Sequence, residues 1–265
     1  MPGRGYIIEN AKSEGIFMKL IFLGTGHGSA TPTHISSVTY LETAGKSYLV
    51  DCADGADAEM LRHGLDPAGL SAIFITHMHM DHNGGLPVVM KRLMKHGEEN
   101  ASPVPVMLAE PETAEVIEKW LVINGFPKVH GRFVYPDPEM EFDDGTVKVN
   151  SFHTKHLAAS GRPSFGYSIA SEGKKLFFTG DLKFGDCADF PLEPARGSDL
   201  MVCELTHFRM PAVMPFLEKL EVGRLVFNHL GNWSQVPEEQ ARIRETCASL
   251  PYPVELAFDG MELTL

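Results

Sequence analysis

The sequence lacks a long apolar run, a signal-peptide core and any closely spaced pair of cysteines. No stretch of about 18 consecutive apolar residues occurs, so we expect no transmembrane helix and no membrane partner. Residues 1–15 contain no apolar core, which argues against secretion. The cysteines are far apart and form no CxxC pair, so we interpret them as reduced core thiols of a cytoplasmic protein. They are Cys52, Cys187, Cys203 and Cys247.

Basic residues are also scarce relative to acidic ones. The chain has 23 Lys and Arg against 35 Asp and Glu, which gives a formal net charge of -12. Affinity for nucleic acid comes largely from Lys and Arg that neutralise phosphates, so we expect no stable nucleic-acid complex. A small phosphate-bearing substrate remains compatible with this charge, because bound divalent ions can dominate the local potential of a pocket.

What the chain does contain is a segment dense in histidine, residues 76–82 (THMHMDH). It follows the apolar run 70–75, which predicts a buried strand, and precedes Asn83-Gly84-Gly85, which is typical of a turn. We therefore place the segment on a loop just past a strand end. The alternative is a polar surface loop that is rich in histidine, but this spacing of ligand-type residues is specific as motifs go.

The side chains of this segment are those that zinc and similar divalent metals prefer, namely neutral imidazoles and a carboxylate. His77 and His79 are two residues apart, so they point the same way in extended backbone. Asp81 and His82 follow after a bend and can face a second metal.

Strands and helices are predicted along the rest of the chain without an intervening linker. We interpret residues 1–17 as an N-terminal extension and residues 18–265 as one domain. Strands are predicted at 18–23, 38–41, 47–50, 70–75, 104–108, 131–135, 147–152, 164–169, 174–181, 199–204, 224–229, 254–256 and 262–265, and helices at 56–64, 86–96, 111–123, 211–220 and 236–250.

Polar residues recur at or just past the ends of these predicted strands, where α/β folds gather their sites. Asp51 has two interpretations: it caps a turn or a helix, or it orients a metal-bound imidazole. The residues at strand ends are Asp51, His77, His156, Asp181, Glu204 and His229.

With these residues in place, the chain resembles the metallo-β-lactamase-fold hydrolases over essentially all of residues 18–265. The most specific part of the match is His77-x-His79-x-Asp81-His82. Asp51 matches the first motif of the family, His156 the third, Asp181 the fourth and His229 the last. The resemblance implies an α/β fold, a four-layer αββα sandwich of two mixed β-sheets flanked by helices, with a two-metal site.

The resemblance also implies a ligand set for two divalent ions, with zinc preferred and manganese or iron open. It assigns His77, His79 and His156 to the first ion, Asp81, His82 and His229 to the second, and Asp181 to a bridging position. Two assignments have competitors. His153 competes with His156, which we prefer because it precedes the 165–167 strand at the distance that the family shows. His207 competes with His229, but it follows Glu204 and is assigned to the pocket.

Within the family, Leu23-Gly24-Thr25-Gly26 and the His156…Gly166-Tyr167 stretch look most like the ribonuclease Z and phosphodiesterase branch. True β-lactamases of this fold carry cysteine at the position of Asp181, and flavodiiron oxidoreductases carry glutamate at that of His79. Members that process tRNA insert a long arm where this chain has only the turn at 171–174. This difference, together with the acidic charge, argues for a smaller phosphodiester.

We therefore expect a dinuclear-metal-dependent hydrolase that cleaves small cyclic or nucleotide-derived phosphodiesters through a metal-bridging hydroxide. Asp81 is the candidate acceptor of the water's proton, and His207, oriented by Glu204, is the candidate general acid. The alternatives are hydrolysis of a lactone or thioester at the same site, a nuclease that processes tRNA or other RNA, and a metal-binding protein without catalysis. The oligomeric state is open, with a homodimer as one option.

Overall fold

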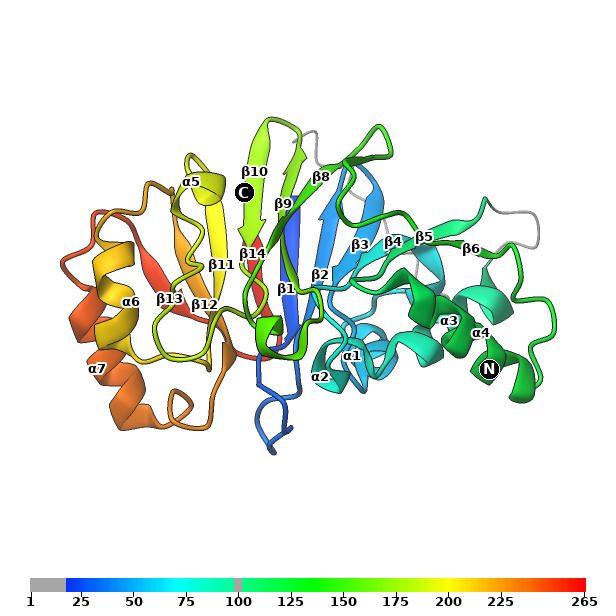
Figure 1. The fold of residues 1–265 in the computed structure, drawn as a ribbon, viewed down its shortest axis with the longest axis horizontal. Helices are drawn as coiled ribbons and strands as arrows, with labels where there is room; N and C mark the ends of the chain where they lie inside the picture. Colours follow the sequence, from blue (N-terminus) through cyan, green and yellow to red (C-terminus); the bar gives the residue numbers. More distant parts are fainter. Residues whose placement is uncertain (1–17, 98–101) are drawn as a thin grey trace, which may run out of the picture.

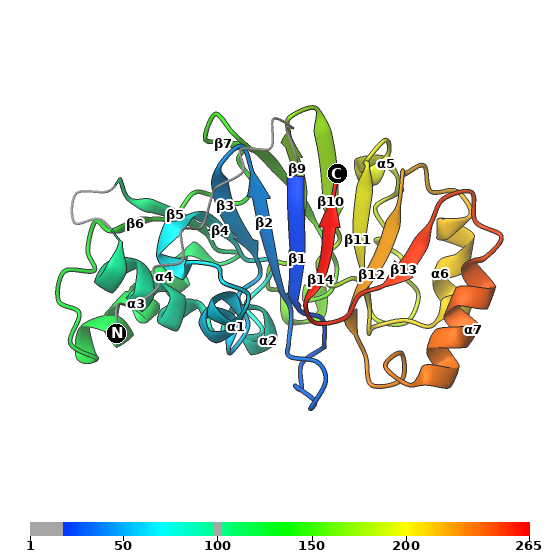
Figure 2. The same ribbon diagram turned by 180° about the vertical axis from the view of Figure 1, so that it is seen from behind.

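The computed structural model describes residues 18–97 and 102–265, and the expected N-terminal extension lies outside them. Two seven-stranded β-sheets face each other, with helices on both outer sides (Figures 1 and 2). This arrangement confirms the predicted fold class. The first sheet has the order β14-β1-β2-β3-β4-β5-β6, and the second has the order β13-β12-β11-β10-β9-β8-β7.

The first sheet consists of β1 (Met18–Gly24), β2 (Val38–Thr43), β3 (Lys46–Val50), β4 (Leu70–Phe74), β5 (Val104–Met107), β6 (Phe133–Val134) and β14 (Met261–Thr264). The second consists of β7 (Phe142–Asp143), β8 (Lys148–His153), β9 (Phe165–Ser171), β10 (Lys174–Phe178), β11 (Leu200–Leu205), β12 (Leu225–Leu230) and β13 (Val254–Leu256). The α-helices are α1 (Ala56–Arg62), α2 (Met80–Asn83), α3 (Leu86–His96), α4 (Ala114–Ile123), α5 (Leu192–Ala195), α6 (Met210–Leu217) and α7 (Pro237–Cys247), and 3-10 turns occupy Pro67–Gly69, Pro111–Thr113 and Ala158–Ser160.

Each sheet is antiparallel in one part and parallel in the other. In the first sheet, β3, β4, β5 and β6 run parallel, and in the second sheet β10, β11, β12 and β13 do so. Because parallel strands end at the same edge of a sheet, the residues that follow β3, β4, β10, β11 and β12 gather there. This edge is therefore where the fold places the predicted ligands.

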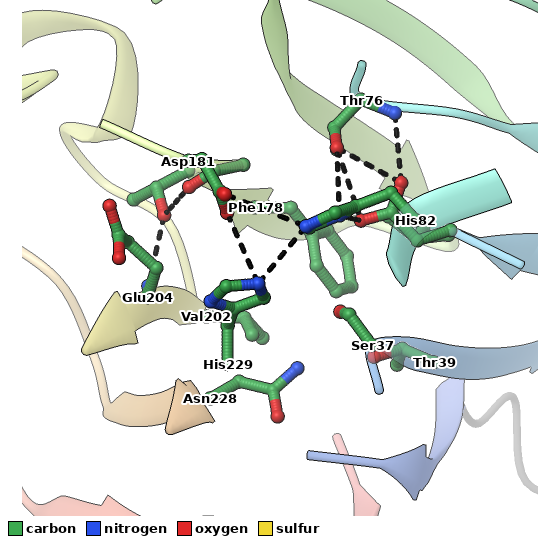
Figure 3. Close-up of a pocket in the computed structure, with 14 residues that line it drawn as sticks. Ser37, Thr39, Thr76, His82, Phe178, Asp181, Val202, Glu204, Asn228 and His229 are labelled. Carbon is green, nitrogen blue, oxygen red and sulfur yellow. Dashed lines mark hydrogen bonds and ion pairs between the residues drawn. The ribbon is translucent and has the colours of Figure 1, made fainter. Parts of the chain in front are cut away.

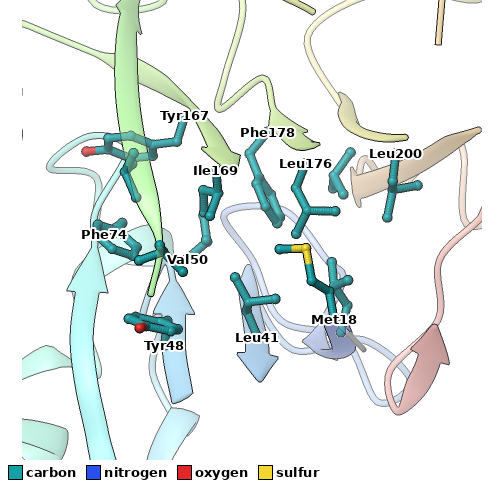
Figure 4. Close-up of a cluster of buried hydrophobic side chains, with 14 of the residues drawn as sticks. Met18, Leu41, Tyr48, Val50, Phe74, Tyr167, Ile169, Leu176, Phe178 and Leu200 are labelled. Carbon is teal, nitrogen blue, oxygen red and sulfur yellow. The ribbon is translucent and has the colours of Figure 1, made fainter. Parts of the chain in front are cut away.

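Alternation along the strands builds three apolar layers. In β1, Leu20 and Phe22 face the space between the sheets, whereas Ile21 and Leu23 pack with the side chains of α1, α3 and α4. The third layer joins the second sheet to α6 and α7. Figure 4 shows the layer between the sheets, where side chains of β3 and β4 meet those of β9 and β10. The side chains of this central layer pack the two sheets against each other.

The structure differs from the sequence prediction mainly in its short elements. Met80–Asn83 is the helix α2 rather than part of a loop and turn, and the predicted helix at 111–123 divides into a 3-10 turn and α4. Strand β7 and helix α5 were not expected. The four cysteines are all free and buried, and within the described ranges no helix is long and apolar enough to cross a bilayer.

Phe74 offers a test of the layer between the sheets. Its side chain is fully buried, and its ring lies 5.5 Å from that of Phe142 and 6.0 Å from that of Tyr167. We expect Phe74→Ala to lower the free energy of unfolding by about 3–5 kcal/mol, because it leaves a cavity that two sheets cannot close. The matched control Ile123→Ala removes a side chain that is 83% exposed and should change it by less than about 0.5 kcal/mol. Urea denaturation of chelator-treated protein measures both, and equal effects would contradict the assignment.

Candidate metal centre

The seven predicted ligands come from five chain segments and meet at the edge where the parallel strands end. His77 and His79 follow β4, and Asp81 and His82 lie in α2 directly after them. Asp181 follows β10, and His229 lies near the end of β12. His156, the seventh, lies in the loop between β8 and β9. Segments as far apart in the chain as His77 and His229 thus supply one cluster of imidazoles and carboxylates.

The first group is formed by three imidazoles. The Nδ1 atom of His79 lies 3.1 Å from Nε2 of His77 and 3.2 Å from Nε2 of His156. These three ring nitrogens belong to one set that could hold a metal ion. The sequence competitor, His153, is turned away, since its side chain is 60% exposed and pairs with Glu139.

The second group contains Asp81, His82 and His229. The Nε2 atoms of His82 and His229 lie 3.0 Å apart, and the Asp81 Oδ2 atom lies 3.3 Å from His229 Nε2 and 3.5 Å from His82 Nε2. Figure 3 shows the rings of His82 and His229 turned toward each other and toward Asp181. The three side chains therefore converge on one point.

Asp181 lies between the two groups. Its Oδ2 atom is 3.6 Å from Nε2 of both His77 and His156 and 3.5 Å from His82 Nε2. Its Oδ1 atom is 3.7 Å from His229 Nε2. The carboxylate is 2% exposed, and within the described residues Oδ1 has no hydrogen-bond partner. It faces both groups at once, as a bridging ligand would.

Burial and mutual charge set the protonation of the cluster. Burial, together with the charge of His82, holds the pKa of His77 well below its usual value. Burial opposes ionisation of Asp181, but the nearby imidazoles of His229, His82 and His77 outweigh it and hold the pKa of Asp181 well below its usual value. Burial lowers the pKa of His82 as well, yet Asp181 and Asp51 raise it well above its usual value. The carboxylates thus attract positive charge into the cluster.

This donor set fits divalent metal ions. Imidazole nitrogens only 3.0–3.2 Å apart direct lone pairs at a common point, which is unfavourable unless a cation or proton lies between them. An ionised carboxylate oxygen that is buried without a hydrogen bond also requires a cation. Nitrogen and oxygen ligands of this kind suit zinc, manganese and iron.

Asp51 orients one of these imidazoles, which favours the second of its two interpretations. Its Oδ2 atom accepts a hydrogen bond from His82 Nδ1 at 2.7 Å, and its Oδ1 atom accepts one from the Thr76 backbone N–H at 2.9 Å. Asp51 adopts a left-handed backbone conformation with φ of 59° directly after β3, which directs its side chain toward His82. The bond fixes His82 Nε2 as the atom that faces the cluster.

A second orienting contact was missed by the sequence analysis. The Thr206 hydroxyl lies 2.9 Å from His229 Nδ1 and donates a hydrogen bond to the His229 backbone carbonyl. Thr206 lies between Glu204 and His207 in the sequence. This proximity to two predicted site residues was the only sequence feature that pointed to Thr206. Like Asp51 for His82, it leaves the Nε2 atom of His229 to face the cluster.

His207 and Glu204 form a pair at the border of the cluster. His207 Nδ1 lies 2.9 Å from Glu204 Oε2 and 3.7 Å from Asp181 Oδ2. Burial lowers the pKa of His207, but the hydrogen bond and charge of Glu204 outweigh it and raise the pKa to about 9. His207, Glu204, Asp181 and His229 also form a set that could hold a metal ion, so His207 remains a competitor for a ligand position.

The loop between β1 and β2 approaches the cluster from the other side. A Cβ atom at Gly28 would lie 3.3 Å from Asp81 Oδ2, so the backbone there is close to this carboxylate. His27 Nε2 lies 2.9 Å from Asn232 Oδ1, which connects this loop to the segment after β12. In the loop between β8 and β9, Arg162 pairs with Glu110, and Lys155 is exposed.

Asp51 generates a direct test of the cluster. Asp51→Asn keeps the backbone conformation and the acceptor for Thr76, but an amide nitrogen cannot accept the His82 Nδ1 proton. We expect metal affinity to fall about 10- to 100-fold with unchanged stoichiometry at saturation, as measured by competition with a chromophoric chelator. Asp54→Asn, an exposed change of the same type nearby, should leave the affinity unchanged. Equal affinities of all three proteins would exclude the orienting role.

Comparison with known proteins identifies the family of the chain. Residues 46–230 match the β-lactamase superfamily domain. The ribonuclease Z of Mycobacterium bovis (strain BCG / Pasteur 1173P2) is 27% identical over 199 residues, which cover 70% of this chain and 69% of that protein.

Solved structures share the fold. The metallo-β-lactamase fold protein YhfI from Bacillus subtilis superposes with a TM-score of 0.73 at 18% identity, covering 93% of this chain and 99% of that one. The Zn²⁺-bound PqqB from Methylobacterium extorquens gives 0.71 at 15% identity, covering 93% and 100%. The matched domain spans most of the chain, from β3 to the end of β12. The chain therefore belongs to the β-lactamase superfamily and is a metal-dependent hydrolase with the metallo-β-lactamase fold.

Proposed function

We propose that the protein hydrolyses small phosphodiesters, such as cyclic or nucleotide-derived ones, at a pair of divalent metal ions. The observation that carries the proposal is the position of Asp181 between two groups of ligand-type side chains, with the His207–Glu204 pair beside it. A paired site suits phosphoryl transfer, because both the attacking and the leaving oxygen need stabilisation. Four free, buried cysteines accord with action in the reducing cytoplasm.

In this proposal His77, His79 and His156 would hold one ion and Asp81, His82 and His229 the other. Asp181, which faces both groups, would serve both. Zinc is the first choice, with manganese and iron as alternatives. When bound, such ions lower the pKa of water and offset negative charge on the phosphoryl oxygens. The protein supplies the orientation of each imidazole through Asp51 and Thr206.

Asp81 orients the attacking water. Burial of this carboxyl opposes ionisation, but hydrogen bonds with His229 and His82 hold its pKa well below the usual value. A carboxylate with such a low pKa is a weak base. Asp81 would therefore hold the water by a hydrogen bond and take its proton only transiently, releasing it to solvent, and His207 would regain from solvent the proton that it donates.

His207 donates a proton to the leaving oxygen. Glu204 accepts the hydrogen bond from His207 Nδ1, so the proton to be transferred is the one on Nε2. With a pKa of about 9, the ring carries this proton at neutral pH. Its side chain is 16% exposed, which leaves it accessible from the substrate side. The reaction leaves a phosphomonoester and an alcohol, which remain parts of one molecule when the diester is cyclic.

A second candidate function is RNA processing, and the name of the Mycobacterium bovis relative, ribonuclease Z, favours it. Two features of this chain favour the smaller substrate. Strands β9 and β10 are joined by the turn Glu172–Gly173 without an insertion, and the net charge is -12. An acyl substrate is the third candidate, because a carbonyl group can use the same ions.

A substrate panel separates these candidates. Zinc- or manganese-loaded protein is assayed with bis-p-nitrophenyl phosphate, nucleoside 2′,3′-cyclic phosphates, a lactone and thioester set, and a tRNA precursor with a 3′ extension. We expect turnover of the first two classes. Turnover of only the acyl set, or cleavage of only the tRNA precursor, would replace the proposal by the corresponding alternative. Absence of activity on all of them with either metal would contradict it.

The role of His207 predicts an effect that depends on the leaving group. His207→Gln should lower kcat about 10²- to 10⁴-fold for cyclic nucleotides, whose alkoxide leaving group needs a proton. It should affect bis-p-nitrophenyl phosphate much less, because p-nitrophenolate leaves without one. Metal content, measured by elemental analysis, should not change. Loss of metal from the variant would instead identify His207 as a ligand and remove the basis for its role as an acid.

A further inference from the structure

The loop between β10 and α5 displays an aromatic side chain beside the metal centre. Phe184 is 78% exposed, although phenylalanine is among the residues most often buried. Its ring and the ring of His207 lie edge to face, with 6.4 Å between the centroids and an interplanar angle of 73°. The exposed ring thus lies next to the residue that protonates the leaving oxygen.

Backbone hydrogen bonds hold Phe184 in this exposed position. On its C-terminal side, the Gly185 N–H donates to the His207 carbonyl oxygen at 2.8 Å. On its N-terminal side, the Lys183 N–H donates to the Asp189 carboxylate at 2.9 Å. Both flanking residues are therefore fixed, and the ring is presented as a preorganised surface instead of folding back into the core.

The same loop is tied to other parts of the centre. The Leu182 N–H donates to Glu204 Oε1 at 2.7 Å, and Glu204 Oε2 binds His207. The Asp189 carboxylate also accepts the N–H of Lys155, the residue before His156. These hydrogen bonds link the loop that carries Phe184 to the segments that carry His207 and His156.

A single ring suits a single planar group better than a protein partner. The loop around Phe184 is polar, and Lys183 pairs with Asp186 at 2.7 Å, so the ring does not belong to an extended apolar patch. Protein interfaces bury hundreds of Å² on each side. Met80, 80% exposed between His79 and Asp81, adds an apolar side chain from α2. Phe184 thus contacts the ring of His207, and Met80 lies between two of the predicted ligands along the chain.

We propose that Phe184 is a specificity-determining residue that stacks on the base carried by the leaving side of a nucleotide-type phosphodiester. The inference rests on the proposed function and names its substrate class: a phosphodiester whose leaving oxygen belongs to a nucleoside. The Phe184 ring contacts His207, whose Nδ1 atom lies 3.7 Å from Asp181 Oδ2, so a nucleoside on the His207 side of a phosphate bound at the centre would pass beside the Phe184 ring. Base–aromatic stacking is sequence-tolerant, so we expect little preference among the four bases.

The test compares two substrates that differ only in the base. Nucleoside 2′,3′-cyclic phosphates and 1-O-methylribose 2′,3′-cyclic phosphate are assayed with the wild type, Phe184→Ala, Phe184→Leu and Phe184→Tyr. Phe184→Ala should lower kcat/KM for the base-bearing substrates about 5- to 100-fold, mainly through KM, and leave the base-free substrate unchanged. Tyrosine should retain the preference and leucine should lose it. Ile123→Ala on α4 is the matched control for removal of an exposed apolar side chain.

Two kinetic outcomes would overturn the inference. An equal loss on both substrates would indicate a structural role for Phe184, and full activity of the leucine variant would indicate a nonspecific apolar contact. If neither substrate is hydrolysed, the proposed function fails, and binding decides the inference separately. Saturation-transfer NMR on metal-loaded protein with a nucleoside 3′-monophosphate should show contact with the base protons in the wild type and not in Phe184→Ala. Equal transfer in both proteins would refute stacking on Phe184.

Discussion

The centre of this molecule depends on the burial of one ionised carboxylate among imidazole rings. Five imidazoles surround Asp181 within 3.7 Å, those of His77, His82, His156, His207 and His229. Removing a carboxylate from water is costly unless opposite charge accompanies it, and here one oxygen has no hydrogen bond among the described residues. The buried carboxylate is therefore stable only if positive charge lies beside it, at the edge where the two sheets bring the ligands together. Divalent cations would supply this charge, and the same charge would offset the negative charge on the phosphoryl oxygens of a bound phosphodiester.

Backbone strain marks the positions where strands deliver these side chains. Non-glycine residues with positive φ are costly unless the surroundings enforce them. Within the described residues, two of the five lie in hairpin turns, at Ala44 and Glu172. Two others, Asp51 and His229, lie at strand ends in the centre, and the former orients His82 while the latter faces it. At these four positions a turn or the metal centre requires an abrupt change of side-chain direction, and the fifth, Cys187, lies in the loop between β10 and α5.

The sequence predicted most of the longer elements, because the apolar run of β1 and the 3.6-residue period of α3 are properties of local sequence. It also placed Asp181 and His229 correctly at strand ends. It could not identify α2 or β7, which have four and two residues and are too short to show a period. Nor could it choose between the two interpretations of Asp51, because the partner of this residue, His82, is 31 positions away. Which ligands share an ion came from the family resemblance, since spacing along the chain does not encode it.

Selectivity in this fold must come from the border of the centre rather than from its ligands. The same imidazoles and carboxylates would stabilise any phosphodiester, large or small, since they contact only the group that all of them share. The border differs: β9 and β10 meet in a two-residue turn, while the loop after Asp181 holds Phe184 beside His207. A long insertion would add contacts remote from the reacting phosphate, whereas an aromatic ring next to the proton donor can recognise only the first group beyond it. The border of this chain holds a contact of the second kind, and on the proposed function it would favour a substrate that ends one nucleoside away from the phosphorus.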